Sequence, residues 1–262
     1  MTSIDSRPAS ERTAAPAVTR ALRILTLLQE ADGRPIPLGE IARGISAAKS
    51  STFNLCQALE EGNMIVRTST GYLLGRRTVE LGGAYISRFN PVRDFYSFCA
   101  AAPLLRHELV QIAVLDGTDV LYLARHEGRA PMRMAAGIGS RFPAAPTAVG
   151  NALLTTLTDS EIAGRFTGPQ HFPRLTDRSV QNLSELLTRV RAARERGYAT
   201  DDNGVHPGVY CVATVIPPWA SAEQPLAIGA TLIADQVDDN FVAAIAGELQ
   251  DAVRQLSNPM MQ

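Results

Sequence analysis

Residues 38–77, LGEIARGISAAKSSTFNLCQALEEGNMIVRTSTGYLLGRR, decide the fold of the first third of the chain. Apolar residues at helical spacing predict a short helix directly after Pro37 and an amphipathic helix over 48–61, which ends before Gly62. Only a short turn separates the two. Two short helices joined in this way are typical of a helix-turn-helix.

The sequence on either side of these two helices extends the pattern. Two β-prone runs, 64–67 and 72–74, flank a loop that ends in glycine, which predicts a hairpin. Upstream, apolar residues from Val18 to Leu28 predict a further helix, with Thr19 in its N-cap region and a stop at Gly33. Three helices followed by a hairpin predict a winged helix. Two alternatives stay open: a purely structural unit, and a winged helix that binds a protein rather than DNA.

The first turns of the 48–61 helix carry short polar side chains and Lys49, the only lysine of the chain. A recognition helix enters the major groove by its N-terminal end, where such side chains meet phosphates and base edges. Asn54 can pair bidentately with adenine, and arginines on or after the hairpin can neutralise phosphates, unless they form only a solvated surface. The candidate DNA-binding residues are Lys49, Ser50, Ser51, Thr52, Asn54, Arg67, Arg76 and Arg77.

Charge and composition agree with this interpretation. Residues 1–90 carry 11 Lys and Arg against 8 Asp and Glu, whereas residues 91–262 carry 14 against 18. Three widely spaced cysteines form neither a metal motif nor a disulfide framework, which favours a reducing cytoplasm and no metal or other cofactor. No apolar run is long enough for a membrane helix. The polar start, 1–16, predicts a disordered lead without a secretory signal.

Beyond the hairpin, a helix over 77–88 is predicted to link the first domain to a second. Small residues at 147–150 favour either the approach of an anionic ligand to backbone N–H groups or close packing of a helix on a sheet. Thr158 and Glu161 predict a capping box. The mixture of elements predicts an antiparallel sheet flanked by helices. The expected helices lie over 91–109, 147–154, 179–196 and 241–256, and the expected strands over 109–116, 119–125, 131–136, 210–216 and 226–233.

The stretch 17–82 resembles the N-terminal domain of IclR-type bacterial transcriptional regulators. The matching motifs are RALRIL at 20–25, EIA at 40–42, KSS at 49–51 and LG at 74–75. The family commonly has an arginine where this chain has Asn54, so the resemblance does not carry the base specificity over.

The second half resembles the GAF-like effector domain of the same family, in the 139–143 loop and in the stretches 147–150, 196–201 and 207–213. The resemblance implies that an effector contacts the start of the 147–154 helix, one aspartate and the strand after the Pro-Gly turn. It also aligns two pocket serines of the keto-acid-binding members with Ala230 and Leu232. The implied effector-binding residues, with a methionine of the 131–136 strand, are Ala148, Val149, Gly150, Asp201, Val209, Cys211, Ala230, Leu232 and Met134.

The loss of both serine hydroxyls predicts an apolar pocket with one polar end. Such a pocket suits an aromatic or mostly apolar carboxylate better than a small keto acid, whose buried oxygens would lack partners at about 1–3 kcal/mol each. An enzymatic alternative is a hydrolase that uses Cys211, His206 and Asp201, although no nucleophile elbow accompanies them.

Taken together, the sequence predicts an α+β regulator, not an enzyme. Its expected parts are a disordered lead (1–16), a winged helix-turn-helix (17–76), a linker helix (77–90) and a GAF-like α/β effector-binding domain with an antiparallel sheet (91–257). We expect a dimer or tetramer on a pseudo-palindromic double-stranded DNA operator, controlled by a small-molecule effector, with repression favoured over activation.

Overall fold

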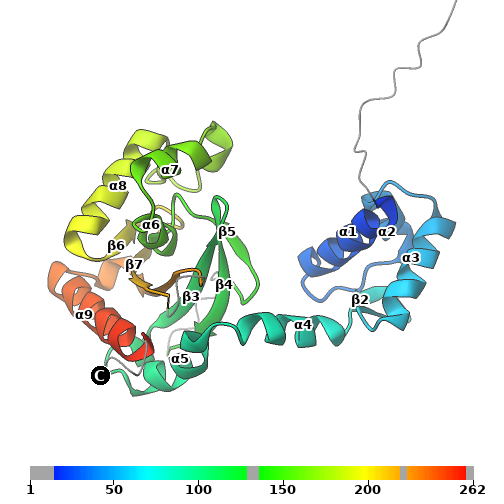
Figure 1. Cartoon of the computed structure of the whole chain (residues 1–262), viewed down its shortest axis with the longest axis horizontal. Coiled ribbons are helices and arrows are strands. Elements are labelled where there is room, and N and C mark those ends of the chain that lie inside the picture. Colours follow the sequence, from blue (N-terminus) through cyan, green and yellow to red (C-terminus); the bar gives the residue numbers. More distant parts are fainter. Residues whose placement is uncertain (1–14, 129–135, 219–222, 258–262) are drawn as a thin grey trace, which may run out of the picture. The chain divides into compact units, whose positions relative to one another are not determined.

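A computed structural model describes residues 15–128, 136–218 and 223–257. The chain divides into two compact units, Met1–Arg88 and Phe89–Gln262. Their elements are labelled in Figure 1. None of the helices among the described residues combines the length and the apolar character that crossing a membrane requires.

The first unit consists of helices followed by a two-stranded hairpin and a last helix. In chain order it contains α1 (Pro16–Glu30), α2 (Leu38–Gly44), α3 (Lys49–Glu61), β1 (Ile65–Arg67), β2 (Tyr72–Leu74) and α4 (Arg77–Ile86). The predicted order of three helices and an antiparallel hairpin is confirmed. Thr19 as an N-cap is wrong: α1 begins at Pro16, whose fixed φ suits the first helical position, and Ala15 is the N-cap.

A single apolar core holds these elements together. Ile36, in the loop after α1, also bridges to Tyr72 of the hairpin and so ties the wing to the helices. Between α2 and α3 the backbone turns through Ser46 with φ of 51°, a left-handed conformation that reverses the chain without a glycine. The buried core residues are Ile24, Leu28, Ile36, Ile41, Ile45, Cys56, Ile65 and Tyr72.

The second unit is built on one six-stranded sheet of order β5-β4-β3-β8-β7-β6, with every neighbouring pair antiparallel, as predicted. Its strands are β3 (Leu109–Asp116), β4 (Asp119–His126), β5 (Arg141–Pro143), β6 (Ala199–Asp202), β7 (Val209–Ile216) and β8 (Leu226–Ile233). Its helices are α5 (Asn90–Ala101), α6 (Ala148–Leu154), α7 (Asp159–Arg165), α8 (Leu183–Arg196) and α9 (Asp239–Leu256).

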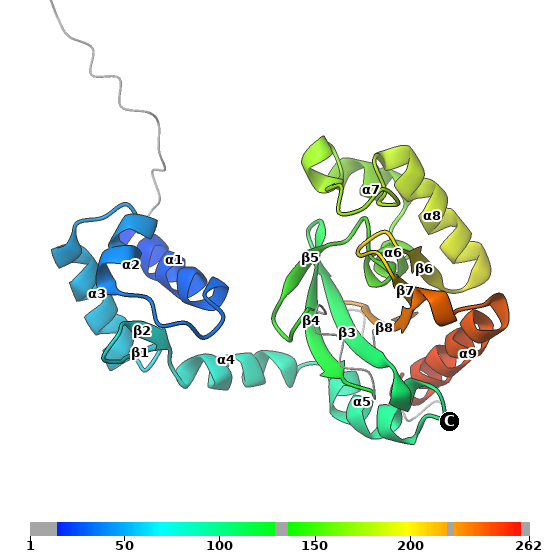
Figure 2. The same cartoon turned by 180° about the vertical axis from the view of Figure 1, so that it is seen from behind.

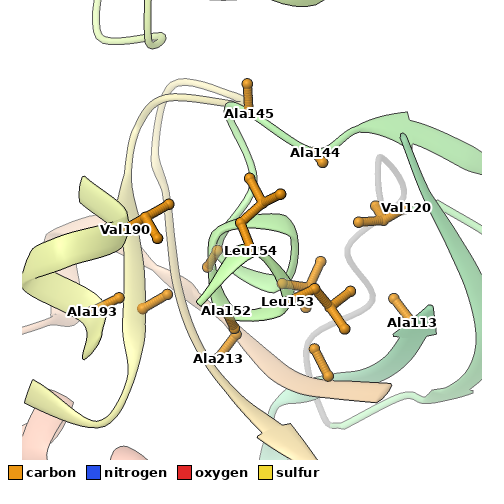
Figure 3. Close-up of a cluster of buried hydrophobic side chains, with 14 of the residues drawn as sticks. Ala113, Val120, Ala144, Ala145, Ala152, Leu153, Leu154, Val190, Ala193 and Ala213 are labelled. Carbon is orange, nitrogen blue, oxygen red and sulfur yellow. The ribbon is translucent and has the colours of Figure 1, made fainter. Parts of the chain in front are cut away.

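Helices cover both faces of this sheet. Figures 1 and 2 show α6 and α8 on one side and α5 and α9 on the other. All seven residues of α6 are buried. Figure 3 shows Leu153 and Leu154 of this helix between Val190 of α8 and Val120 of β4. The main core of the unit therefore lies around α6.

Several boundaries differ from the prediction. The helix expected over 91–109 ends at Ala101, because Pro103 cannot continue a helix and disfavours helical backbone in the residue before it. Helix α8 begins at Leu183 rather than near Ser179, because the side chain of Asn182 caps it. The short strands β5 and β6 were not expected. Only Ala136 of the strand expected over 131–136 is described, and Met134 lies outside the described residues.

Two local signals are confirmed. Thr158 and Glu161 form a reciprocal capping box at the start of α7. Gly197, with φ of 84°, ends α8 in the left-handed conformation that glycine adopts without strain. Both show that short-range hydrogen bonding set these helix ends.

Gly150 offers a test of how closely α6 packs. A Cβ at this position would collide with the backbone carbonyl of Ala144, which cannot rotate away as a side chain can. We expect Gly150→Ala to destabilise the protein by about 1–3 kcal/mol through overpacking. In α9, Gly247 has no atom within 4 Å of such a Cβ. Gly247→Ala should therefore stabilise the protein by about 0.5–1 kcal/mol, as alanine does in helix interiors. Urea unfolding followed by circular dichroism measures both, and equal effects would contradict the close packing.

Candidate functional site

The N-terminal half of α3 exposes a set of small polar side chains and one charge. Lys49, Ser50, Ser51 and Asn54 are all exposed. Thr52 is fully buried, and its hydroxyl donates to the carbonyl of Ala48 at 3.0 Å. Its inclusion among the DNA-binding candidates is therefore wrong: it lies on the inward face of the helix, one turn before the buried Cys56. The exposed candidates form a polar surface at the start of α3.

Sequence reasoning missed one residue on this helix. The side chain of Phe53 is 40% exposed, between Thr52 and Asn54. An apolar residue in an amphipathic helix is ordinarily assigned to the core, and only its place in the helical period could have indicated exposure.

Three arginines lie on or after the wing. Arg67 ends β1, and Arg76 and Arg77 stand at the start of α4; all three are exposed. Arg77 Nη1 lies 2.6 Å from Glu80 Oε2, so its charge is partly neutralised within α4. The structure thus leaves Arg67 and Arg76 as the more strongly cationic of the three.

The second unit contains a cavity of about 340 Å³ beside α6. Strands β3, β4, β7 and β8, the start of α6 and the loop between β6 and β7 contribute to its wall. Most lining residues are apolar. The residues that line it are Gln111, Tyr122, Ala136, Phe142, Thr147, Ala148, Val149, Val205, His206, Pro207, Val209, Cys211, Val212, Gly229, Ala230 and Thr231.

Five of the predicted effector-binding residues lie in this wall: Ala148, Val149, Val209, Cys211 and Ala230. Gly150 does not line it. Its amide donates to Thr147 Oγ1 at 3.0 Å, and its lack of a side chain serves the contact with Ala144. Of the two interpretations of these small residues, the structure supports close packing at Gly150.

Leu232 also lies outside the cavity. Cys211, which lines it, pairs with Thr231 across the strands, and its Sγ donates to Thr231 Oγ1 at 3.6 Å. Gly229, Ala230 and Thr231 of β8 line the cavity, whereas Leu232 does not. Leu232, predicted to bind the effector, is therefore not a lining residue, and Thr231, which the sequence analysis did not select, supplies a hydroxyl to the wall.

Polar groups in the wall are few and mostly engaged. Gln111 Nε2 donates to the carbonyl of Ala136 at 2.7 Å. His206 Nδ1 lies 2.6 Å from the carbonyl of Pro207, so Nδ1 carries a proton and Nε2 is left for another partner. His206 is the one basic side chain among the described lining residues. Burial raises the pKa of Tyr122, which keeps its hydroxyl protonated.

Asp201 lies behind this wall rather than in it. Its side chain is 1% exposed, and it accepts hydrogen bonds from the amides of Gly204 and Val205 at 2.9 and 3.2 Å. Burial raises the pKa of this carboxyl to about 6, against the lowering effect of the two amides and of Arg189. The assignment of Asp201 as a residue that lines the effector cavity is therefore corrected.

The hydrolase alternative finds no geometric support in these residues. Cys211 directs its thiol to Thr231, and His206 is bonded to its neighbouring carbonyl. Burial raises the pKa of Cys211 to about 12, whereas a catalytic cysteine needs a lowered one. Within the described part of the chain, no three His, Cys, Asp or Glu side chains come together as a metal site would require.

A helix-turn-helix unit joined to an α/β unit with an apolar cavity defines the class: a transcriptional regulator with a separate sensing unit. Family models agree. The IclR helix-turn-helix domain matches residues 17–69, and the C-terminal domain of the bacterial transcriptional regulator IclR matches residues 85–258. The chain belongs to the IclR family of bacterial transcriptional regulators, as the sequence predicted.

Individual relatives cover most of the chain. The HTH-type transcriptional repressor AllR of Salmonella typhimurium is 29% identical over 206 residues, 77% of this chain and 74% of AllR. The HTH-type transcriptional regulator XynR of Escherichia coli is 26% identical over 247 residues, 93% of this chain and 96% of XynR. The crystal structure of an IclR homolog from Microbacterium hydrocarbonoxydans, complexed with 4-hydroxybenzoate, shares the fold with a TM-score of 0.76. It is 19% identical, and the match covers 91% of this chain and 99% of the homolog.

The reactivity of the three cysteines tests whether their thiols are buried as the structure shows. Burial raises the pKa of Cys56 to about 11 and those of Cys99 and Cys211 to about 12. At pH 8 a thiol with a pKa of about 11 is a thiolate in about one molecule in a thousand. We expect Ellman's reagent to react with the folded protein at least about a hundredfold more slowly than with the protein in guanidinium chloride. One fast thiol in the folded protein would contradict this and would favour a nucleophilic cysteine.

Proposed function

We propose that this regulator is a repressor that binds a pseudo-palindromic operator as a dimer or tetramer, and that an aromatic or mostly apolar carboxylate in the cavity controls its operator affinity. One observation carries the proposal. The same chain presents an exposed polar helix start in its helix-turn-helix and, in its second unit, an apolar cavity with a single basic side chain. The relative AllR is named a repressor, which supports repression here.

The DNA contacts are assigned to the start of α3 and to the wing. Lys49, Ser50 and Ser51 are free to meet the phosphate backbone, and Asn54 lies one turn further, where a base edge is within reach. Arg67 and Arg76 add phosphate contacts. Thr52 has no part in this surface.

Self-association is assigned to the apolar residues that the first unit leaves exposed. Helix α4 has ten residues and buries none of them, although Val79 is 75% exposed and Leu81 49%. So short a helix gains most of its stability from packing, which a second copy of the chain supplies. Val18 and Leu22 on α1 are exposed as well, at 58% and 60%. Exposed apolar side chains of this kind are typical of protein interfaces.

The effector class follows from the cavity wall. A volume of about 340 Å³ lies in the range of small-molecule sites, and a keto acid of two or three carbons would leave most of it empty. Thr231 supplies one hydroxyl, so the argument against such acids rests on size and apolar character rather than on the loss of both serines. Phe142, Val149 and Val209 suit an aromatic ring. With both ring nitrogens protonated, His206 can donate from Nε2 to the carboxylate while Nδ1 keeps its bond to Pro207. The homolog complexed with 4-hydroxybenzoate supports this choice of probe.

The DNA-binding surface and the effector cavity are coupled if the protein binds the effector with a different affinity when it is on the operator than when it is free. By linkage, DNA then changes effector affinity by the same factor as the effector changes DNA affinity, and such coupling free energies are typically about 1–3 kcal/mol. Helix α4 is the last element of the first unit and leads along the chain into the second, so we assign the transmission of the change to this helix.

The DNA-binding assignment is tested by fluorescence anisotropy with labelled DNA from the region beside the protein's own gene, against scrambled DNA, over a series of salt concentrations. Asn54→Ala should weaken specific binding by about 1–3 kcal/mol, since it removes a base contact. Lys49→Ala should weaken binding to both DNAs and reduce the slope of log K against log salt by about 1, since it removes a phosphate contact.

Gln57→Ala is the matched control for both variants. Gln57 is exposed on the same helix, one turn beyond Asn54, and its amide donates to Glu61 rather than facing the helix start. The affinity of Gln57→Ala for the operator DNA should stay within about threefold of that of the unchanged protein, as is usual for surface substitutions. If Asn54→Ala and Lys49→Ala behaved like this control, α3 would not be the recognition helix.

The effector assignment is tested by calorimetric titration. We expect 4-hydroxybenzoate to bind more tightly than pyruvate or glyoxylate, because the cavity wall is apolar and large. His206→Gln should weaken 4-hydroxybenzoate binding by about tenfold, close to the about 1.5 kcal/mol that a hydrogen bond to a charged group contributes. His171→Gln, outside the cavity, is the control. Tight binding of glyoxylate and none of the aromatic acid would reject this effector class.

A further inference from the structure

One wall of the cavity is a loop rather than a strand or helix. Between β6 and β7, Val205, His206 and Pro207 line the cavity. The loop is held at its base, where the amide of Gly208 donates to Asn203 Oδ1 at 2.6 Å. It is also held from outside, where Ser179 Oγ donates to the carbonyl of Gly204 at 2.7 Å. A loop fixed at this many points presents its lining side chains in one arrangement.

Asp201 makes the innermost of these attachments. It is the buried residue of β6 directly across from the cavity-lining Cys211. Its two carboxylate oxygens accept from the amides of Gly204 and Val205, the residues that lead into the lining segment. Gly204 lies so close that a Cβ would collide with Asp201 Oδ1. The carboxylate and the loop are thus fitted to each other, and Asp201 itself does not line the cavity.

We propose that Asp201 is a positioning residue for the effector: from behind the wall its carboxylate holds the 203–208 loop in the form that completes the cavity, and protonation of this carboxylate loosens the loop and weakens effector binding. The proposal rests on the proposed effector function of the cavity. It differs from a ligand contact, because the carboxylate has both oxygens engaged by the backbone and lines no part of the cavity.

The charges around Asp201 make this protonation accessible. Burial raises the pKa of Asp201 to about 6, while the two amides and Arg189 of α8, whose Nη1 lies 3.8 Å from Oδ1, lower it. Asp202 on the same strand raises it. Cys211 of β7 and Tyr122 of β4 face the same region and stay neutral, since burial raises the pKa of each. The thiol and the phenol therefore keep their charge in the range where the carboxylate changes its own.

The direction of two pH effects separates positioning from simple stabilisation. The folded-state pKa of Asp201, about 6, lies above the 3.8 of an unperturbed aspartate, so its contribution to global stability is present below pH 3.8 and is lost as pH rises through 6. Effector affinity changes in the opposite direction. It should fall as pH decreases through about 6, by at most about tenfold per pH unit for one linked proton. A residue needed only for folding would not move the two in opposite directions.

The test uses Asp201→Asn in the full-length protein. The variant keeps one carbonyl oxygen but sets an NH₂ group against one of the two loop amides. Hydrogen exchange of the 203–208 segment, corrected for intrinsic rates, is measured from pH 5 to 7.5. The affinity for 4-hydroxybenzoate is measured over the same range in a His206→Gln background, which removes the imidazole from the cavity wall. We expect protection at pH 7.5 to fall at least tenfold, the affinity to fall at least tenfold, and the pH dependence of both to disappear.

Arg189→Gln supplies a second, milder variant. It leaves the carboxylate in place but removes the guanidinium that favours its ionised form, so the midpoint of both pH profiles should move upward. Arg191→Gln is the matched control, since Arg191 lies on the same helix and pairs instead with Asp159 at 2.6 Å. Its profiles should match those of the unchanged protein.

The outcomes distinguish this proposal from the proposed function. Loop protection in Asp201→Asn equal to that of the unchanged protein at every pH would overturn the positioning role. So would equal affinities of the two proteins for 4-hydroxybenzoate. If 4-hydroxybenzoate fails to bind even the unchanged protein, the proposed effector class is wrong, and the exchange data alone decide whether Asp201 holds the loop.

Discussion

The contact between α6 and the sheet is the constraint on which the second unit depends. The helix buries every one of its residues, and Gly150 passes so near the carbonyl of Ala144, in the turn that leads into the helix, that no side chain fits between them. In the sheet itself, Gly229 of β8 leaves room for Val149 of α6, because a side chain at Gly229 would collide with that of Val149. Small residues thus let the helix lie close at its first turn. The cavity adjoins that contact, because Val149 and Gly229 also line it. The rest of its wall includes other residues of β8 and the 203–208 loop. The same residues therefore take part in the close packing of α6 on the sheet and in the wall of the cavity.

Periodicity explains where sequence reasoning chose the wrong side chains. Strand β8 is buried on both faces, so hydrophobicity does not show which residues meet the cavity, and a slip of one residue exchanges the faces. Leu232 was assigned to the cavity from the family resemblance, which the strand's own pattern could not check, and Thr231, which lines the cavity, was missed. Thr52 stands among the polar residues at the start of α3, but its helical spacing with Leu55 and Cys56 places it on the inward face. Its hydroxyl is satisfied by the carbonyl of Ala48 within the helix, so burial leaves no unpaired group.

The elements that could be predicted are those whose signals are local. The winged helix follows from helical spacing, a short turn and a glycine-ended hairpin. The antiparallel hairpin of β3 and β4, the capping box at Thr158 and the stop at Gly197 follow in the same way. Strands β5 and β6 have three and four residues, and β6 ends in two aspartates, so their strand form depends on pairing with β4 and β7 rather than on their own propensity. Such pairing cannot be read from a single segment.

Resemblance to a family places a residue but does not determine what it touches. The aspartate expected at the effector site stands where the resemblance puts it, on the strand beside Cys211. Its two carboxylate oxygens accept hydrogen bonds from two backbone amides, and its side chain does not line the cavity. In the proposed mechanism the side chains that face the cavity, apolar apart from a few polar groups and His206, select the chemical class of the effector. Asp201 then sets the shape of one wall. Substitutions behind the wall can accordingly change affinity while the preferred ligand class stays the same, because they act on geometry and not on contact chemistry.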